Sequence, residues 1–118
     1  MRAIVLFAHG SRDPLWCRPV EAVARRIREL APDVPVRCAY LELMEPDLFT
    51  AVRATIGLGA DSITVLPMFL GVGRHAREDL PALLAVLGLE HPLVRFDLRP
   101  AVGEDARVVA LMAEIALS

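Results

Sequence analysis

Signals for buried strands and amphipathic helices alternate along the whole chain, and this alternation is what most constrains its fold. The first strand is expected at residues 3–8, where the continuous apolar run AIVLFA is typical of a strand buried on both faces of a parallel sheet. Further strands are expected at residues 34–43, 61–70 and 93–98. Helical patterns occupy the intervals, as crossover connections between parallel strands require.

The first two helices have clear boundaries in the sequence. Pro19 stands at a favoured first helical position, and apolar residues then recur at helical spacing until the chain approaches Pro32. Pro46 is expected to open the second helix, which Gly57 and Gly59 end.

The third helix is harder to place because Pro81 falls inside an otherwise helical pattern. We predict that Asp79 caps this helix and that Pro81 lies in its first turn, which leaves residues 71–78 mostly as a loop. A last helix is expected at residues 104–117. Its apolar positions are Val108, Leu111, Met112 and Ile115.

Four consecutive strand-helix units predict an α/β fold with right-handed crossovers and helices on both faces of the sheet. We expect a single domain over residues 1–118, with a four-stranded parallel sheet in the flavodoxin-like order 2-1-3-4. In such sheets, ligands bind beyond the carboxyl ends of the strands, at the switch point between the first and third strands.

Polar residues that could take part in catalysis or binding gather after the strands, so they are expected at that one edge of the sheet. The opposite edge, where His91 is expected, has no comparable cluster, and we interpret His91 as structural. The residues at the ligand-binding edge are His9, Ser11 and Arg12 after the first strand, Glu42 and Glu45 after the second, and Arg74, His75 and Arg77 after the third.

Two imidazoles and a carboxylate at one edge suit a divalent transition metal such as Co²⁺, Ni²⁺, Fe²⁺ or Zn²⁺. The nearby arginines indicate a pocket for an anionic ligand. Structural readings stay open for several of these residues. Glu42 or Glu45 can stabilise the following helix by interacting with the positive end of its dipole. The backbone at Gly71 and Gly73 can bind an anion or simply form a loop.

Composition excludes several classes of protein. All 13 basic residues are arginine, which rules out Schiff-base chemistry and a P-loop lysine. The net charge of −2, without a block of like charge, argues against nucleic acid or membrane partners. Ser11 lacks the G-x-S-x-G turn of serine hydrolases. Cys17 and Cys38 have no metal-site spacing and are expected to be free thiols in the cytoplasm.

Three segments resemble the motifs of small CbiX-type class II chelatases, which insert a divalent metal into sirohydrochlorin. They are HGSRDP at residues 9–14, YLELMEPDL at residues 40–48 and LPMFLGVGRHAREDLP at residues 66–81. The likeness covers nearly the whole chain in order and spacing, and the third motif is the most specific.

The resemblance implies insertion of a divalent metal into sirohydrochlorin without ATP, in cobalamin or siroheme biosynthesis, with Co²⁺ as the first candidate metal. It implies a homodimer that encloses one tetrapyrrole, and no cofactor besides the substrate metal. His9 and His75 would bind the metal, and Glu42 would assist proton removal. Ser11, Arg12 and Arg74 would bind the substrate, with Arg77 as a further candidate.

Other functions stay open beside this one. The same residues would serve a ferrochelatase or a nickelochelatase, and a non-catalytic carrier of metal or tetrapyrrole would use the same ligands without turnover. A histidine phosphatase also has His-Gly after its first strand, but it needs an arginine where this chain has Ala8.

Overall fold

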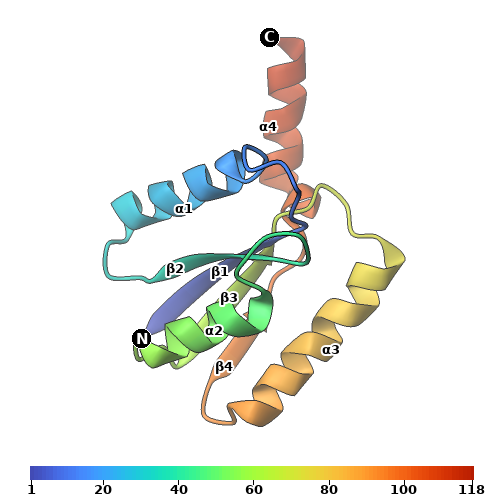
Figure 1. Ribbon diagram of the computed structural model, residues 1–118. Coiled ribbons are helices and arrows are strands. Elements are labelled where there is room, and N and C mark those ends of the chain that lie inside the picture. The colour runs from blue at the N-terminus through green and yellow to red at the C-terminus, as the bar shows by residue number, and fades with distance from the viewer.

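Four parallel strands form one sheet in the order β2-β1-β3-β4, as the sequence predicts (Figure 1). In the computed structural model, the backbone of residues 1–118 and every side chain except that of His75 are described. The central strand β1 (Arg2–Ala8) pairs with β2 (Val36–Tyr40) and β3 (Ser62–Pro67), and β4 (Arg95–Leu98) pairs with the far side of β3. β2 and β3 are shorter than predicted at both ends, whereas β4 starts two residues later than predicted and ends at Leu98 as predicted.

The interior position of β1 explains its unbroken apolar sequence. Val5 and Phe7 point to one face of the sheet and Leu6 and Ala8 to the other, and none of the four is more than 2% exposed. Burial of such side chains stabilises the fold by roughly 1.5–3 kcal/mol for each large one.

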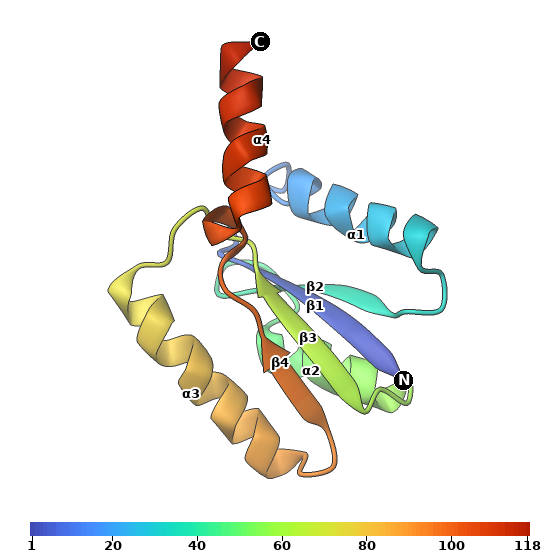
Figure 2. The same cartoon turned by 180° about the vertical axis from the view of Figure 1, so that it is seen from behind.

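Helices cover the two faces of the sheet unequally (Figures 1 and 2). On one face, α2 (Leu48–Gly57) and α3 (Arg74–Glu90) pack on the sheet through buried residues such as Val52 and Leu87. On the other face, α1 (Arg18–Leu30) packs alone, through Val20 and Ala24. The prediction of helices on both faces is confirmed.

The start of α2 differs slightly from the prediction that Pro46 opens the helix. The helix begins at Leu48, and Asp47 is its cap, because the Asp47 carboxylate accepts a hydrogen bond of 2.8 Å from the backbone N–H of Thr50. That hydrogen bond lowers the pKa of Asp47 below its usual value.

The start of α3 contradicts the sequence prediction. The helix begins at Arg74 with Gly73 as its cap, so Asp79 is not the cap, Pro81 lies inside the helix, and most of residues 71–78 are not loop. A proline inside a helix costs about 3 kcal/mol because it removes a hydrogen bond and crowds the preceding turn. Apolar burial outweighs this cost. The apolar contacts of α3 with the core begin before the proline and continue after it at helical spacing, through Ala76, Leu80, Leu83, Leu84 and Leu87.

The chain ends in a short 3₁₀ helix, η1 (Val102–Glu104), followed by α4 (Ala106–Leu117), which begins two residues later than predicted. α4 points away from the sheet instead of covering it (Figures 1 and 2). No residue of α4 is buried. Among the described residues, none of the helices has the length and apolar character needed to cross a bilayer.

Candidate functional site

Backbone hydrogen bonds continue past the ends of β1 and β2 and fix the loops that carry the site. The N–H of Leu41 donates to the carbonyl of Ala8 at 2.9 Å, and the N–H of Glu42 donates to the carbonyl of His9 at 3.0 Å. The segment after β2 is therefore tied directly to the segment after β1. His9 and Glu42, which the sequence places at one edge of the sheet, are neighbours in the structure.

Gly10 makes this close approach of the two loops possible. Its φ of +94° lies in the left-handed region, which side chains with a Cβ rarely adopt. A Cβ at this position would also overlap the carbonyl oxygen of Glu42. The glycine in the sequence HGS is thus required by the contact between the loops.

The His9 ring lies against Phe69, which follows β3. The two ring centroids are 4.5 Å apart, with an angle of 40° between the ring planes. Phe69 is only 4% exposed and also meets the ring of Phe7 edge-on, at 6.1 Å between centroids. A buried aromatic side chain therefore supports one face of His9, while His9 itself remains exposed.

A cavity of about 210 Å³ opens beside His9, between the end of the sheet and the first turns of α3. It brings His9 together with Arg74, as the sequence predicts, and its walls are mostly apolar. Its other lining residues are Phe7, Leu41, Phe69, Gly73, Ala76, Asp79, Leu80 and Leu83.

Other predicted site residues surround this cavity without lining it. Glu42 is exposed and is linked to His9 through the backbone. Ser11 has a local structural role, since its hydroxyl accepts a hydrogen bond of 3.1 Å from the N–H of Asp13. Arg12, in the same loop, is exposed.

The remaining predicted residues lie in different places. Arg74 makes an exposed ion pair with Glu78, at 3.3 Å between nitrogen and oxygen, which leaves its guanidinium accessible. Arg77 lines a separate cavity of about 170 Å³, and Glu45 lines a groove near Arg37, beside α1. The structure thus brings Arg74 to His9 and does not bring Arg77 or Glu45 there.

The side chain of His75, predicted as the second metal-binding histidine, lies outside the described part of the structure. Its backbone belongs to the first turn of α3, next to Arg74. Among the side chains that are described, no three His, Cys, Asp or Glu are grouped so that they could hold a metal ion.

Both cysteines are free, as the sequence predicts. Burial raises the pKa of the Cys38 thiol. The pKa of Cys17 is also raised, first by desolvation and then by a hydrogen bond with Glu21. Both side chains are therefore protonated thiols near neutral pH, and neither is an activated nucleophile.

The apolar side of the site was missed by sequence reasoning, which concentrated on polar residues. Phe69 and Leu41 belong to apolar runs that we assigned wholly to strands, although both follow the last residue of their strand. Pro67, which ends β3 two residues before Phe69, was the available signal that the strand stops there.

The sequence pattern of the CbiX family matches residues 3–117. The chain belongs to the CbiX family. A sirohydrochlorin cobaltochelatase from Methanopyrus kandleri is 37% identical over 86 residues, which cover 73% of this chain and 60% of that protein. A sirohydrochlorin ferrochelatase from Bacillus subtilis is 31% identical over 109 residues, 92% of this chain and 41% of that protein. The chain thus spans less than two thirds of the length of either relative.

Solved structures of CbiX-type proteins share the fold. The CbiX protein from Marinobacter aquaeolei superposes with a TM-score of 0.84 at 36% identity, over 99% of this chain and 95% of that one. The sirohydrochlorin chelatase SirB from Bacillus subtilis subspecies spizizenii, solved in complex with cobalt, gives a TM-score of 0.82 at 27% identity. That match covers 98% of this chain and 50% of SirB.

The contact at Gly10 yields a prediction for the site. Gly10→Ala should lower the melting temperature markedly, because the new Cβ meets both an unfavourable φ and the Glu42 carbonyl. Gly57→Ala is the matched control, since no atom lies within 4 Å of the added Cβ at that position. Thermal unfolding measures both. Equal melting temperatures for the two variants would contradict the account of Gly10.

Proposed function

We propose that this CbiX-family protein inserts a divalent metal into sirohydrochlorin without ATP, with Co²⁺ as the first candidate metal. The observation that carries the proposal is the cavity at the carboxyl edge of the sheet, which His9, resting on Phe69, lines together with Arg74. This is the switch-point position at which folds of this kind bind ligands. The names of the relatives, and the cobalt complex of SirB, point to the same reaction.

The chemistry of insertion matches the residues at this edge. Two pyrrole N–H protons must leave the macrocycle while the metal exchanges water for ring nitrogens. A neutral imidazole can hold the ion or accept a proton, and we assign this role to His9 and, on the motif alone, to His75. Glu42, held beside His9 by the backbone hydrogen bond, is the acceptor for the departing protons.

The apolar walls and the arginines suit the two parts of the pigment. Phe69, Leu41 and Leu83 offer an apolar surface to the flat ring system. Sirohydrochlorin carries carboxylates around its rim, which Arg74 and Arg12 can bind through charge-assisted hydrogen bonds. Ser11, in the same loop as Arg12, completes the proposed substrate-binding set.

One chain encloses only part of such a ligand. The cavity of about 210 Å³ is smaller than the ~300–1,000 Å³ typical of sites for drug-sized molecules. Large apolar side chains are also exposed on the surrounding loops, among them Leu41 at 48% and Leu70 at 71%. We therefore include a homodimer in the proposal, with the second copy covering the other side of the macrocycle. A cytoplasmic location is proposed because the thiols are unpaired.

The proposal predicts catalysed insertion. Purified protein mixed with sirohydrochlorin and Co²⁺ in the absence of ATP should change the absorption spectrum of the pigment faster than metal and pigment alone. Parallel reactions with Fe²⁺ and Ni²⁺ identify the preferred metal. A rate equal to the uncatalysed background with all three ions, together with tight binding of pigment or metal, would instead show a carrier.

The proposed roles predict different defects in two variants. His9→Ala should weaken Co²⁺ affinity and insertion together, because a ligand is lost. Glu42→Gln keeps the shape but removes the base, so insertion should slow by about 10²–10⁴-fold while pigment binding is retained.

Titration with Co²⁺ and single-turnover kinetics separate these effects. His91→Ala, at the opposite edge of the sheet, and Glu29→Gln, on the exposed surface of α1, are the matched controls. Normal affinity and rate in His9→Ala would show that the metal site is misplaced. Full activity in Glu42→Gln would assign that carboxylate a structural role.

A further inference from the structure

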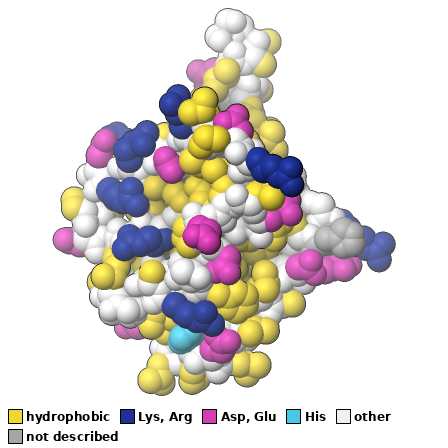
Figure 3. All heavy atoms as spheres, in the orientation of Figure 1, with side chains coloured by type: hydrophobic (Ala, Val, Ile, Leu, Met, Phe, Trp, Pro, Cys, Tyr) yellow, Lys and Arg dark blue, Asp and Glu magenta, His cyan; other side chains and the backbone are white. Residues whose placement is uncertain are grey.

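Three arginines line one groove at the free edge of the sheet. The groove, of about 440 Å³, lies between α1 and β2, which is an edge strand. Arg25 and Arg28 line it from α1, where their spacing of three residues places them on one side of the helix, and Arg37 lines it from β2. Dark blue side chains gather over this part of the molecule, at the left of Figure 3. The groove thus concentrates positive charge in a chain whose net charge is −2.

Two of these arginines are held close together by one shared acceptor. The guanidinium groups of Arg28 and Arg37 both donate to the backbone carbonyl oxygen of Val36, at 3.0 and 3.1 Å. Because both nitrogens are bonded to the same oxygen, they lie no more than about 6 Å apart. Like charges at this separation repel each other, and partial burial of the two hydrogen bonds reduces the screening by solvent. An anion that contacts both guanidinium groups would relieve this repulsion.

The three guanidinium groups of the groove have no carboxylate partner in the part of the chain that the structure describes. Arg26, on another side of α1, shows the contrast, because it pairs with Glu29 at 2.8 Å. The positive charge in the groove is therefore not neutralised within the chain.

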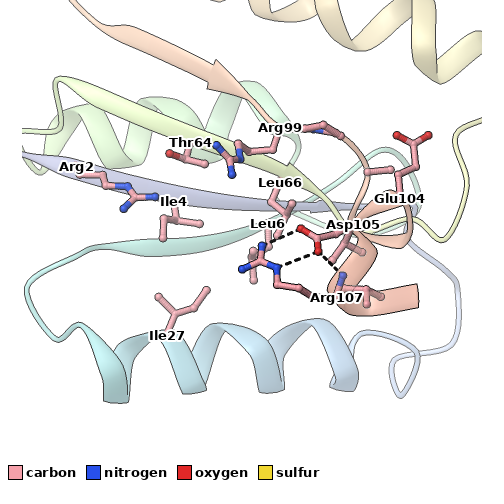
Figure 4. A pocket seen from close by; sticks show the side chains of 14 residues that line it. Arg2, Ile4, Leu6, Ile27, Thr64, Leu66, Arg99, Glu104, Asp105 and Arg107 are labelled. Atoms are coloured by element: carbon pink, nitrogen blue, oxygen red, sulfur yellow. Dashed lines mark hydrogen bonds and ion pairs between the residues drawn. The ribbon is translucent and has the colours of Figure 1, made fainter. Parts of the chain in front are cut away.

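A second groove that arginines line differs in this respect. It has a volume of about 490 Å³ and lies on the sheet face beside α1 (Figure 4). Two of its three arginines have partners: Arg107 donates hydrogen bonds of 2.8 and 3.0 Å to the carboxylate of Asp105, and Arg99 pairs with Asp97 at 3.5 Å. The chain supplies carboxylates to those arginines, whereas the arginines at the free edge are left for an external anion.

Two carboxylates line the groove at the free edge, but they lie toward its other end. α1 runs in the opposite direction to β2 (Figure 1), so Glu21, two turns before Arg28, is near the end of β2 and not near its start. The Glu21 carboxylate accepts a hydrogen bond of 3.4 Å from the thiol of Cys17, at the start of α1. Glu45 belongs to the loop after β2, whereas Arg37 is the second residue of that strand. The groove is therefore positive where β2 begins and negative where β2 ends.

The middle of the groove offers apolar surface and a backbone donor. Ala24, Tyr40 and Pro46 line it there. The N–H of Tyr40 points away from β1 and donates to the carbonyl of Pro46 at 2.9 Å. Because N–H groups two residues apart on a strand point the same way, the N–H of Cys38 also faces the free edge, where it can donate to a ligand. The volume of the groove falls within the ~300–1,000 Å³ typical of sites for small molecules.

We propose that this groove binds a phosphate group, either as free phosphate or as part of a small organic molecule. A phosphate monoester carries a charge of about −1.5 to −2 near neutral pH and has three acceptor oxygens. One such group can accept hydrogen bonds from Arg28 and Arg37 together, and Arg25 adds a third positive charge. A carboxylate, with a single charge, would neutralise only one of these arginines. The site is at the free edge of β2, away from the cavity beside His9, and it does not depend on the proposed reaction.

Titration of the purified chain with inorganic phosphate tests the site without pigment or metal. In a phosphate-free buffer of low ionic strength, backbone amide NMR should show saturable shifts centred on Arg28, Arg37 and Cys38. Arg37→Gln should weaken phosphate binding by about tenfold or more, because a charge-assisted hydrogen bond is lost. Arg25→Gln should also weaken binding, and this exposed side chain has no ion pair in the described structure whose loss could disturb the fold.

Arg26→Gln is the matched control, because it removes the same charge from the same helix outside the groove. Its affinity for phosphate should equal that of the parent protein. Absence of saturable binding up to about 10 mM phosphate, or equal weakening in Arg25→Gln and Arg26→Gln, would overturn the proposal. Because the measurement is binding alone, such a result would leave the proposed insertion reaction untouched.

Comparison of ligands identifies the source of the phosphate. Glycerol 3-phosphate should bind more tightly than inorganic phosphate where the organic part contacts the apolar middle of the groove, and equal affinities would assign the site to free phosphate. Acetate tests the preference for a doubly charged anion. Acetate binding as tight as that of phosphate would overturn the assignment of the ligand.

Discussion

The pairing of β1 with a parallel strand on each side is the constraint on which the rest of the structure depends. It places β1 in the interior of the sheet, where helices cover both of its faces, and it aligns the carboxyl ends of β1, β2 and β3 at one edge. The loops that leave this edge carry His9, Glu42 and the start of α3. Because Gly10 lets the first two loops approach to backbone contact, hydrogen bonds and not only side-chain packing determine their arrangement.

The candidate site combines an apolar support with exposed polar groups. Phe69 is part of the core and also the surface on which the His9 ring rests, so the position of His9 is coupled to core packing. Arg74 comes from the first turn of α3, which extends toward the site because burial outweighs the cost of Pro81. The contacts of Phe69 and α3 that bury the core thus also determine where His9 and Arg74 lie. Beside α1, part of the other sheet face lines an open groove, and no residue of α4 is buried, so one chain leaves part of this burial incomplete.

Much of the architecture could be predicted from the sequence because it follows from apolar periodicity. The strand order, the buried first strand and the gathering of His9 and Glu42 at one edge needed only the run AIVLFA and the alternation of elements. The predicted start of α3 was wrong because it followed a local rule that places proline in the first turn of a helix. The burial that outweighs this rule is visible only in the folded core. The direction of α4 had no signal in the sequence, since an amphipathic helix reads the same wherever its partner surface lies. The contact of Phe69 with His9 joins residues distant in sequence and could not be predicted from either motif alone.

The central claim is that metal is handled at the carboxyl edge of the sheet, beside His9. Paramagnetic NMR tests it most directly: ¹⁵N-labelled protein is titrated with Co²⁺, and broadening and shifts of each backbone amide are mapped onto the structure. The account predicts that the strongest effects appear together at Gly10, Glu42 and Arg74, and that they fade toward the opposite edge. Effects centred on His91, or no site-specific change at stoichiometric Co²⁺, would contradict it.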